Sequence, residues 1–98
     1  MELKEAHIKV RGRVQGVFFR AFVRDNARDI GLSGKVWNAD EDSVEMIVQG
    51  PEKGIMELKK RCSEGPLAAR VNGIDMTWAT VDGLYAGFEI ARDRHGDA

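Results

Sequence analysis

Cysteine is almost absent from this chain of 98 residues, in which Cys62 is the single example. One thiol excludes an internal disulfide and the several thiolates of a structural zinc site. A lone cysteine is typical of a reducing compartment, so we expect a cytoplasmic protein. The first residues lack the apolar run of a signal peptide, and no segment approaches the roughly eighteen apolar residues of a membrane span. We therefore expect no membrane partner.

A surplus of positive charge is missing as well. Fifteen basic and sixteen acidic side chains leave a formal net charge of −1. A dedicated nucleic-acid binder needs excess basic residues to displace counterions, so this balance argues against a nucleic-acid partner but permits a small basic site. The length predicts a single domain over residues 1–91, with a flexible tail over 92–98, and we expect a monomer.

The apolar residues that are present follow two different periods. Strict alternation predicts strands over residues 5–12, 34–39 and 44–49, near 71–79, and around 88–90. Steps of three or four predict one helix from about residue 19 to 30 and another from about 51 to 64, with Pro51 at the first helical position of the second. Glycines at the helix ends, Gly31 and Gly65, agree with these limits. This order predicts an α+β fold, a ferredoxin-like βαββαβ sandwich with a mixed or antiparallel sheet and both helices on one face.

The start of the first predicted helix lacks an ordinary cap. The residues before it are Gln15-Gly16-Val17-Phe18, where a helix usually has Ser, Thr, Asp or Asn, and Arg20 and Arg24 follow. Positive charge opposes the helix dipole at this end. Uncapped amides beside a cation become favourable if they bind an anion such as phosphate. The alternative is that the glycines bend the chain and Arg20 is simply solvated.

Asn38 is the second candidate. It has the same parity as Val36, so its side chain is expected on the helix-covered face near the end of a strand, where a polar group needs partners. The alternative is an asparagine that closes the turn before Asp40.

Taken together, these segments resemble the acylphosphatase family. The first family signature is matched by Gly12-Arg13-Val14-Gln15-Gly16-Val17-Phe18-Phe19-Arg20. The second is matched by Gly34, Val36, Asn38, Val44 and Gly50. The resemblance extends from about residue 3 to residue 91. Lys35 and Asp42 depart from the usual pattern, since the family has an aromatic residue and a turn glycine there, but both are expected to lie away from the phosphate.

The resemblance implies hydrolysis of a small-molecule acyl phosphate to a carboxylate and inorganic phosphate. It implies that the phosphoryl group is bound by backbone amides and by the Arg20 guanidinium, and that the Asn38 side chain holds the attacking water. The amides implied are those of Gln15, Gly16, Val17, Phe18, Phe19 and Arg20. It also implies that the reaction uses no metal, no cofactor and no phosphoenzyme.

Other reactive or exposed residues are interpreted more plainly. Cys62 lies on the apolar stripe of the second predicted helix and is taken as a core thiol, not a nucleophile. His7 and His95 are expected at the surface without metal-ligand spacing, and residues 40–42 are taken as a solvated acidic turn. Trp37 is expected to be exposed on the open face of the sheet, either as an isolated aromatic residue or as part of a partner surface.

Two alternatives to an enzyme remain. An RNA-recognition module with the same strand order would need aromatic residues on its central strands, and residues 44–49 contain none. A non-catalytic acylphosphatase-like domain could act in a larger assembly. The short chain and the presence of both Arg20 and Asn38 favour the enzyme.

Overall fold

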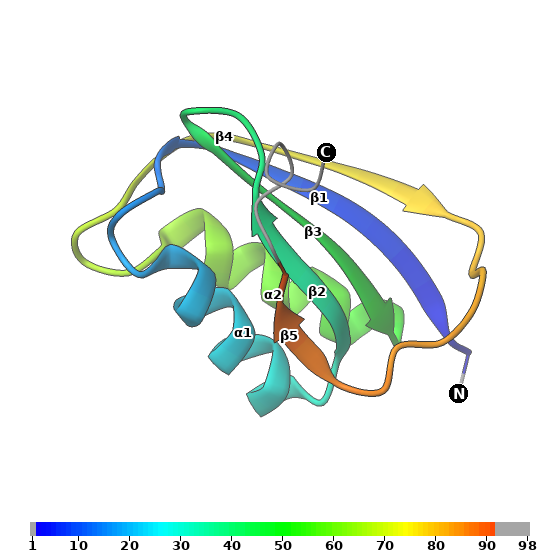
Figure 1. Ribbon diagram of the computed structural model, residues 1–98. Helices are drawn as coiled ribbons and strands as arrows, with labels where there is room; N and C mark the ends of the chain where they lie inside the picture. Colours follow the sequence, from blue (N-terminus) through cyan, green and yellow to red (C-terminus); the bar gives the residue numbers. More distant parts are fainter. Residues whose placement is uncertain (1, 92–98) are drawn as a thin grey trace.

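Five strands form one mixed sheet in the computed structural model, which describes residues 2–91 (Figure 1). The strands are β1 (Lys4–Arg13), β2 (Ser33–Asn38), β3 (Ser43–Gly50), β4 (Arg70–Ala79) and β5 (Phe88–Ile90), and the helices are α1 (Phe19–Ile30) and α2 (Glu52–Glu64). The strand order is β4-β1-β3-β2-β5. β5 runs parallel to β2, and the other neighbouring strands are antiparallel. The predicted α+β, ferredoxin-like fold is confirmed.

Both helices pack against the same face of this sheet (Figure 1). The interior strand β1 directs Ala6, Ile8 and Val10 toward the helices, and each of these residues is at most 1% exposed. Phe19, Val23 and Ala27 of α1 and the apolar stripe of α2 complete the core. The helices are also joined by Arg61, whose Nη1 lies 3.0 Å from Asn26 Oδ1 and 3.0 Å from Asp29 Oδ2. Core packing and these hydrogen bonds therefore hold α1 in place against the sheet and α2.

The predicted limits of the elements agree with the structure to within a few residues. Pro51 is the residue before α2, in an extended conformation, instead of the first helical residue. The predicted tail and His95 lie outside the described residues. Neither helix in the described part of the chain is both long and apolar enough to cross a membrane.

The open face of the sheet is less exposed than alternation predicts. Trp37 lies on this face, opposite Glu45, but the prediction of an exposed ring is wrong because the residue is only 5% exposed. The ammonium of Lys35 lies 5.7 Å from the centroid of the Trp37 ring and 5.9 Å from that of Tyr85. The chain between β4 and β5 brings Tyr85 to this face. The alternation of residues within β2 alone therefore predicts too much exposure for Trp37.

The same connection buries polar residues at the other end of the open face. Gln49 is 1% exposed and Glu5 is 8% exposed. The Gln49 amide donates to Glu5 Oε1 at 2.9 Å and to the carbonyl of Gly83 at 2.8 Å, and its oxygen accepts a bond from the Tyr85 amide at 3.0 Å. A buried amide whose donors and acceptor are used in this way fixes the path of the connection.

The packing of β2 against β3 can be tested with glycine substitutions. Gly34 has a φ of 142°, and a Cβ atom there would overlap the carbonyl oxygen of Ile47. Gly34→Ala is therefore expected to lower the free energy of unfolding by about 2–4 kcal/mol, measured by urea denaturation. At Gly87 an added Cβ meets nothing within 4 Å, so Gly87→Ala is the matched control and should change stability by less than about 1 kcal/mol. Equal losses in the two variants would contradict this packing.

Candidate active site

The chain between β1 and α1 makes a turn with alternating backbone hand. Gly16 has a φ of 73°, and Phe18 has a φ of 61° and a ψ of 24°. Phe18 is the only described residue other than glycine with a positive φ. A bulky side chain in this region costs on the order of 1–3 kcal/mol and is retained only where surrounding structure enforces it. Successive residues of alternating hand direct their amides into one concavity, the geometry of a backbone anion nest.

The amides of this turn and of the helix entrance have no acceptor in the described part of the chain. The first hydrogen bond of α1 joins the Phe22 amide to the Phe18 carbonyl at 3.0 Å. Within residues 2–91, no hydrogen bond is donated by the amides of residues 15–19. Phe18 provides no side-chain cap, and the first turn of the helix contains no acidic residue. The donors therefore remain available at the positive end of the helix dipole.

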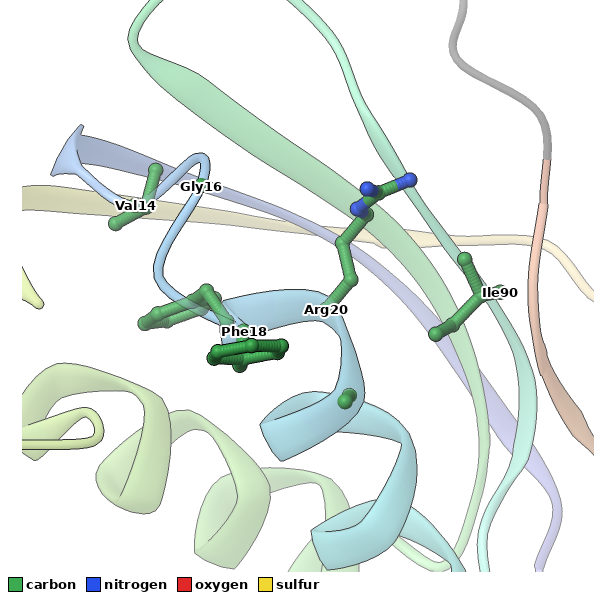
Figure 2. Close-up of a pocket in the computed structure, with 7 residues that line it drawn as sticks. Val14, Gly16, Phe18, Arg20 and Ile90 are labelled. Atoms are coloured by element: carbon green, nitrogen blue, oxygen red, sulfur yellow. The ribbon is translucent and has the colours of Figure 1, made fainter.

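Arg20 faces the same space as the turn. Arg20 and Gly16 line one cavity of about 320 Å³, together with five apolar residues: Val14, Phe18, Phe19, Ala21 and Ile90. Figure 2 shows the Arg20 side chain and the Val14–Gly16 segment extending in the same direction beyond the start of α1. The guanidinium of Arg20, which is the second residue of α1, and residues of the turn therefore border a common cavity.

Asn38 lies at the end of β2 on the helix-covered face. It pairs with Val44, and Val44 pairs with Val10, so the three residues lie at one level of the sheet and on one face. Asn38 is 7% exposed, and its side-chain oxygen Oδ1 is buried without a hydrogen-bond partner. A buried acceptor without a partner is costly unless it binds a water or a ligand. Asn38 is not among the residues that line the cavity beside Arg20.

Gln15 connects the turn to the hairpin that carries Asn38. Its side-chain nitrogen donates to the carbonyl of Ser43 at 2.9 Å and also to the carbonyl of Asp40. The Gly12 amide donates to the Asp42 carbonyl at 2.9 Å, which adds a second connection to the same hairpin. The sequence reasoning considered only the backbone amide of Gln15. The positioning by its side chain was missed, because nothing local indicates a contact with residues 40 and 43.

The two residues that depart from the family pattern lie where they were expected. The Asp42 side chain is exposed in the hairpin turn, and Lys35 lies on the open face, opposite in parity to Asn38. Two residues after Asn38, Asp40 pairs with Lys9, whose Nζ lies 2.8 Å from Asp40 Oδ2. The hydrogen bond to Asp40 raises the pKa of Lys9. The ammonium of Lys9 thus neutralises the carboxylate of Asp40 just after the end of β2.

A comparison with known protein families identifies the family of this chain. The acylphosphatase family model matches residues 6–90, which includes the turn, Arg20 and Asn38. The chain belongs to the acylphosphatase family. An acylphosphatase from Roseiflexus sp. (strain RS-1) is 39% identical over 90 residues, covering 92% of this chain and 97% of that protein.

Solved structures agree with this assignment. The structure of an acylphosphatase from Coxiella burnetii has a TM-score of 0.86 and 35% identity, covering 91% of this chain and 93% of that chain. The crystal structure of full-length HypF in a phosphate- and nucleotide-bound form also matches, with a TM-score of 0.85 and 28% identity. That match covers 95% of this chain but 12% of the HypF chain. The family and fold expected from the sequence are confirmed.

Cys62 does not belong to the site. It is fully buried on α2, within the core. Burial raises the pKa of its thiol to about 12, so the thiol is protonated and unreactive near neutral pH.

We expect a thiol reagent at pH 8 to leave the folded protein unlabelled and to label Cys62 once urea unfolds the chain. The burial of the neutral thiol also stabilises the fold below the ordinary pKa of 9.0, and this contribution is lost as the pH rises toward about 12. As the pH rises through this range, the free energy of unfolding should therefore fall less for Cys62→Ala than for the unaltered protein, because the variant has no thiol to ionise. Rapid labelling of the folded protein would contradict the burial of Cys62.

Proposed function

We propose that the protein hydrolyses acyl phosphates in the cavity at the start of α1, with Arg20 and the turn amides binding the phosphoryl group and Asn38 positioning water. Membership of the acylphosphatase family supports the reaction. The observation that carries the assignment to this cavity is the row of unpaired amides at residues 15–19 beside Arg20. A cytoplasmic, monomeric protein without a nucleic-acid partner remains a prediction.

Phosphate binding follows from the charge and direction of these donors. The amides of Gln15, Gly16, Val17, Phe18 and Phe19 supply partial positive charge at the helix dipole, and Arg20 supplies a full charge. A guanidinium can donate two parallel bonds to phosphoryl oxygens, each contributing roughly 1.5–3 kcal/mol. Because the strained turn holds the amides in place before the substrate arrives, they act as an oxyanion hole for the equatorial oxygens.

The reaction needs little beyond positioning, because an acyl phosphate already has a good carboxylate leaving group. The water oxygen forms a bond to phosphorus while the bond between phosphorus and the acyl oxygen breaks in line with it. Asn38 is neutral and cannot act as a base, but its unpaired Oδ1 can accept a hydrogen bond from the water and orient it. The water's proton then passes late to a phosphate oxygen, which gives inorganic phosphate and a carboxylate.

A second candidate function comes from the match to HypF. A domain with this fold accounts for only part of that longer chain, so a chain of this kind can act within a larger protein. If this were the role here, the isolated chain would bind phosphate without turning over acyl phosphates. The two candidates therefore differ in a direct assay.

We expect the purified chain to release phosphate from acetyl phosphate and benzoyl phosphate, and to do so equally well with a chelator present. Inorganic phosphate should inhibit competitively, because it occupies the same amides and guanidinium as the substrate. Turnover lost with the chelator would contradict the metal-free mechanism. Phosphate binding without turnover would favour the domain role.

Substitutions should separate the two parts of the site. Arg20→Ala is expected to lower kcat/KM by at least about a hundredfold and to weaken inhibition by phosphate. Asn38→Ala is expected to lower kcat strongly while the inhibition constant of phosphate stays nearly constant, since it removes the water's partner and leaves the phosphate donors. Arg24→Ala, one turn further along α1, and Asn72→Ala, exposed on β4, are matched controls that should retain activity. The assignment fails if Asn38→Ala weakens phosphate binding as much as Arg20→Ala does.

A further inference from the structure

The cavity at the start of α1 offers more than a place for phosphate. Apart from Gly16 and Arg20, its lining consists of apolar residues: Val14, Phe18, Phe19, Ala21 and Ile90. Its volume of about 320 Å³ corresponds to roughly ten water molecules, which is more space than a phosphoryl group fills. Most of the protein surface that lines this cavity is therefore apolar.

In-line attack determines which part of the substrate lies there. The water and the leaving acyl oxygen must be on opposite sides of phosphorus. Asn38, which holds the water, lies on the sheet and does not line the cavity, whereas Arg20 and Gly16 do. With the phosphoryl group bound beside Arg20 and water approaching from Asn38, the acyl group is directed to the side of phosphorus opposite the water, into the apolar part of the cavity.

Two side chains on different elements form the open border of that part. Phe18 is 86% exposed although it is large, apolar and held in a left-handed conformation before α1. Ile90 pairs with Val36 on the helix-covered face of β5 and is 37% exposed. In Figure 2, Ile90 lies across from the Arg20 side chain, on the opposite side from the Val14–Gly16 segment. Exposed apolar side chains that line one cavity are an unusual use of surface and are typical of ligand contact.

We propose that Phe18 and Ile90 form an acyl subsite that selects acyl phosphates with extended apolar acyl groups over acetyl phosphate and over acyl groups that end in a carboxylate. This inference rests on the proposed function and adds the substrate class. Binding an alkyl chain between these side chains removes apolar surface from water on both partners, and each methylene buried there increases kcat/KM severalfold.

The test compares hexanoyl phosphate with acetyl phosphate, because the two leaving carboxylates are similarly basic. For the unaltered protein, kcat/KM for hexanoyl phosphate should exceed that for acetyl phosphate by about tenfold or more. Ile90→Ala and Phe18→Ala should each reduce this ratio by at least roughly threefold. The intrinsic reactivity of each substrate is the same for every variant, so a change in the ratio reports the subsite and not general damage to the fold.

Leu84→Ala is the matched control. Leu84 is also a large exposed apolar residue, at 78% exposure, but it lies in the β4–β5 connection and does not line the cavity. The ratio should stay the same in this variant. A ratio near one in the unaltered protein, or an unchanged ratio in both Ile90→Ala and Phe18→Ala, would overturn the acyl subsite while acetyl phosphate turnover still supports the proposed function. If neither substrate is turned over, the proposed function itself fails and the subsite fails with it.

A substitution can also be designed to raise the relative activity toward a different substrate. Misfolding would not produce such a change in selectivity. Ile90→Lys places an ammonium at the border of the cavity, where it can pair with the distal carboxylate of succinyl phosphate. The ratio of kcat/KM for succinyl phosphate to that for hexanoyl phosphate should rise by at least about tenfold relative to the unaltered protein. An unchanged ratio would show that the acyl group does not reach Ile90 and would overturn its part in the subsite.

Discussion

The left-handed turn between β1 and α1 is the constraint on which the active site depends. A helix that began with an ordinary polar cap would use one or two of its first amides internally and would leave fewer of them for a substrate. Here Gly16 and Phe18 turn the chain so that those amides face the cavity, and Gln15 holds the turn against the β2–β3 hairpin. The conformational strain at Phe18 is offset by these connections and by the packed layer of Phe19 and α1 below.

Strand pairing and hydrogen bonds also hold the turn after β1 and Asn38 at a fixed relative position. The proposed phosphate donors lie on the connection after β1, whereas Asn38 lies at the end of β2, with β3 between the two strands. The pairing of Val10 with Val44 and of Val44 with Asn38 sets their level, and the hydrogen bonds from Gln15 and Gly12 to residues 40–43 join the same two segments outside the sheet. Sheet register and side-chain contacts thus specify one position of Asn38 relative to the turn after β1.

Most of the fold could be predicted from sequence because its signals are local. Alternation in β1 and β3 and the helical stripe from Phe19 to Ala27 each report burial within one element, and the absence of a side-chain cap at the start of α1 could be read from the local sequence. The features that were missed join segments far apart in sequence. The burial of Trp37, the contacts of Gln49 with residues 83 and 85, and the hydrogen bonds of Gln15 all depend on where a connection runs. Residue type and period do not encode such a path, and Ile90 became part of the cavity only because β5 pairs with β2.

The position of β1 between β4 and β3 has a consequence for how the protein folds. This strand pairs with β3 on one side and with β4 on the other, so residues near the two ends of the described chain, such as Glu5 and Ala79, must meet before β1 has both neighbours. Contacts of such long sequence separation carry a large loop-closure entropy and slow the search for the native state. Until β4 docks, one backbone edge of β1 is open to pairing with other chains, which makes late synthesis or slow refolding the stage most vulnerable to aggregation.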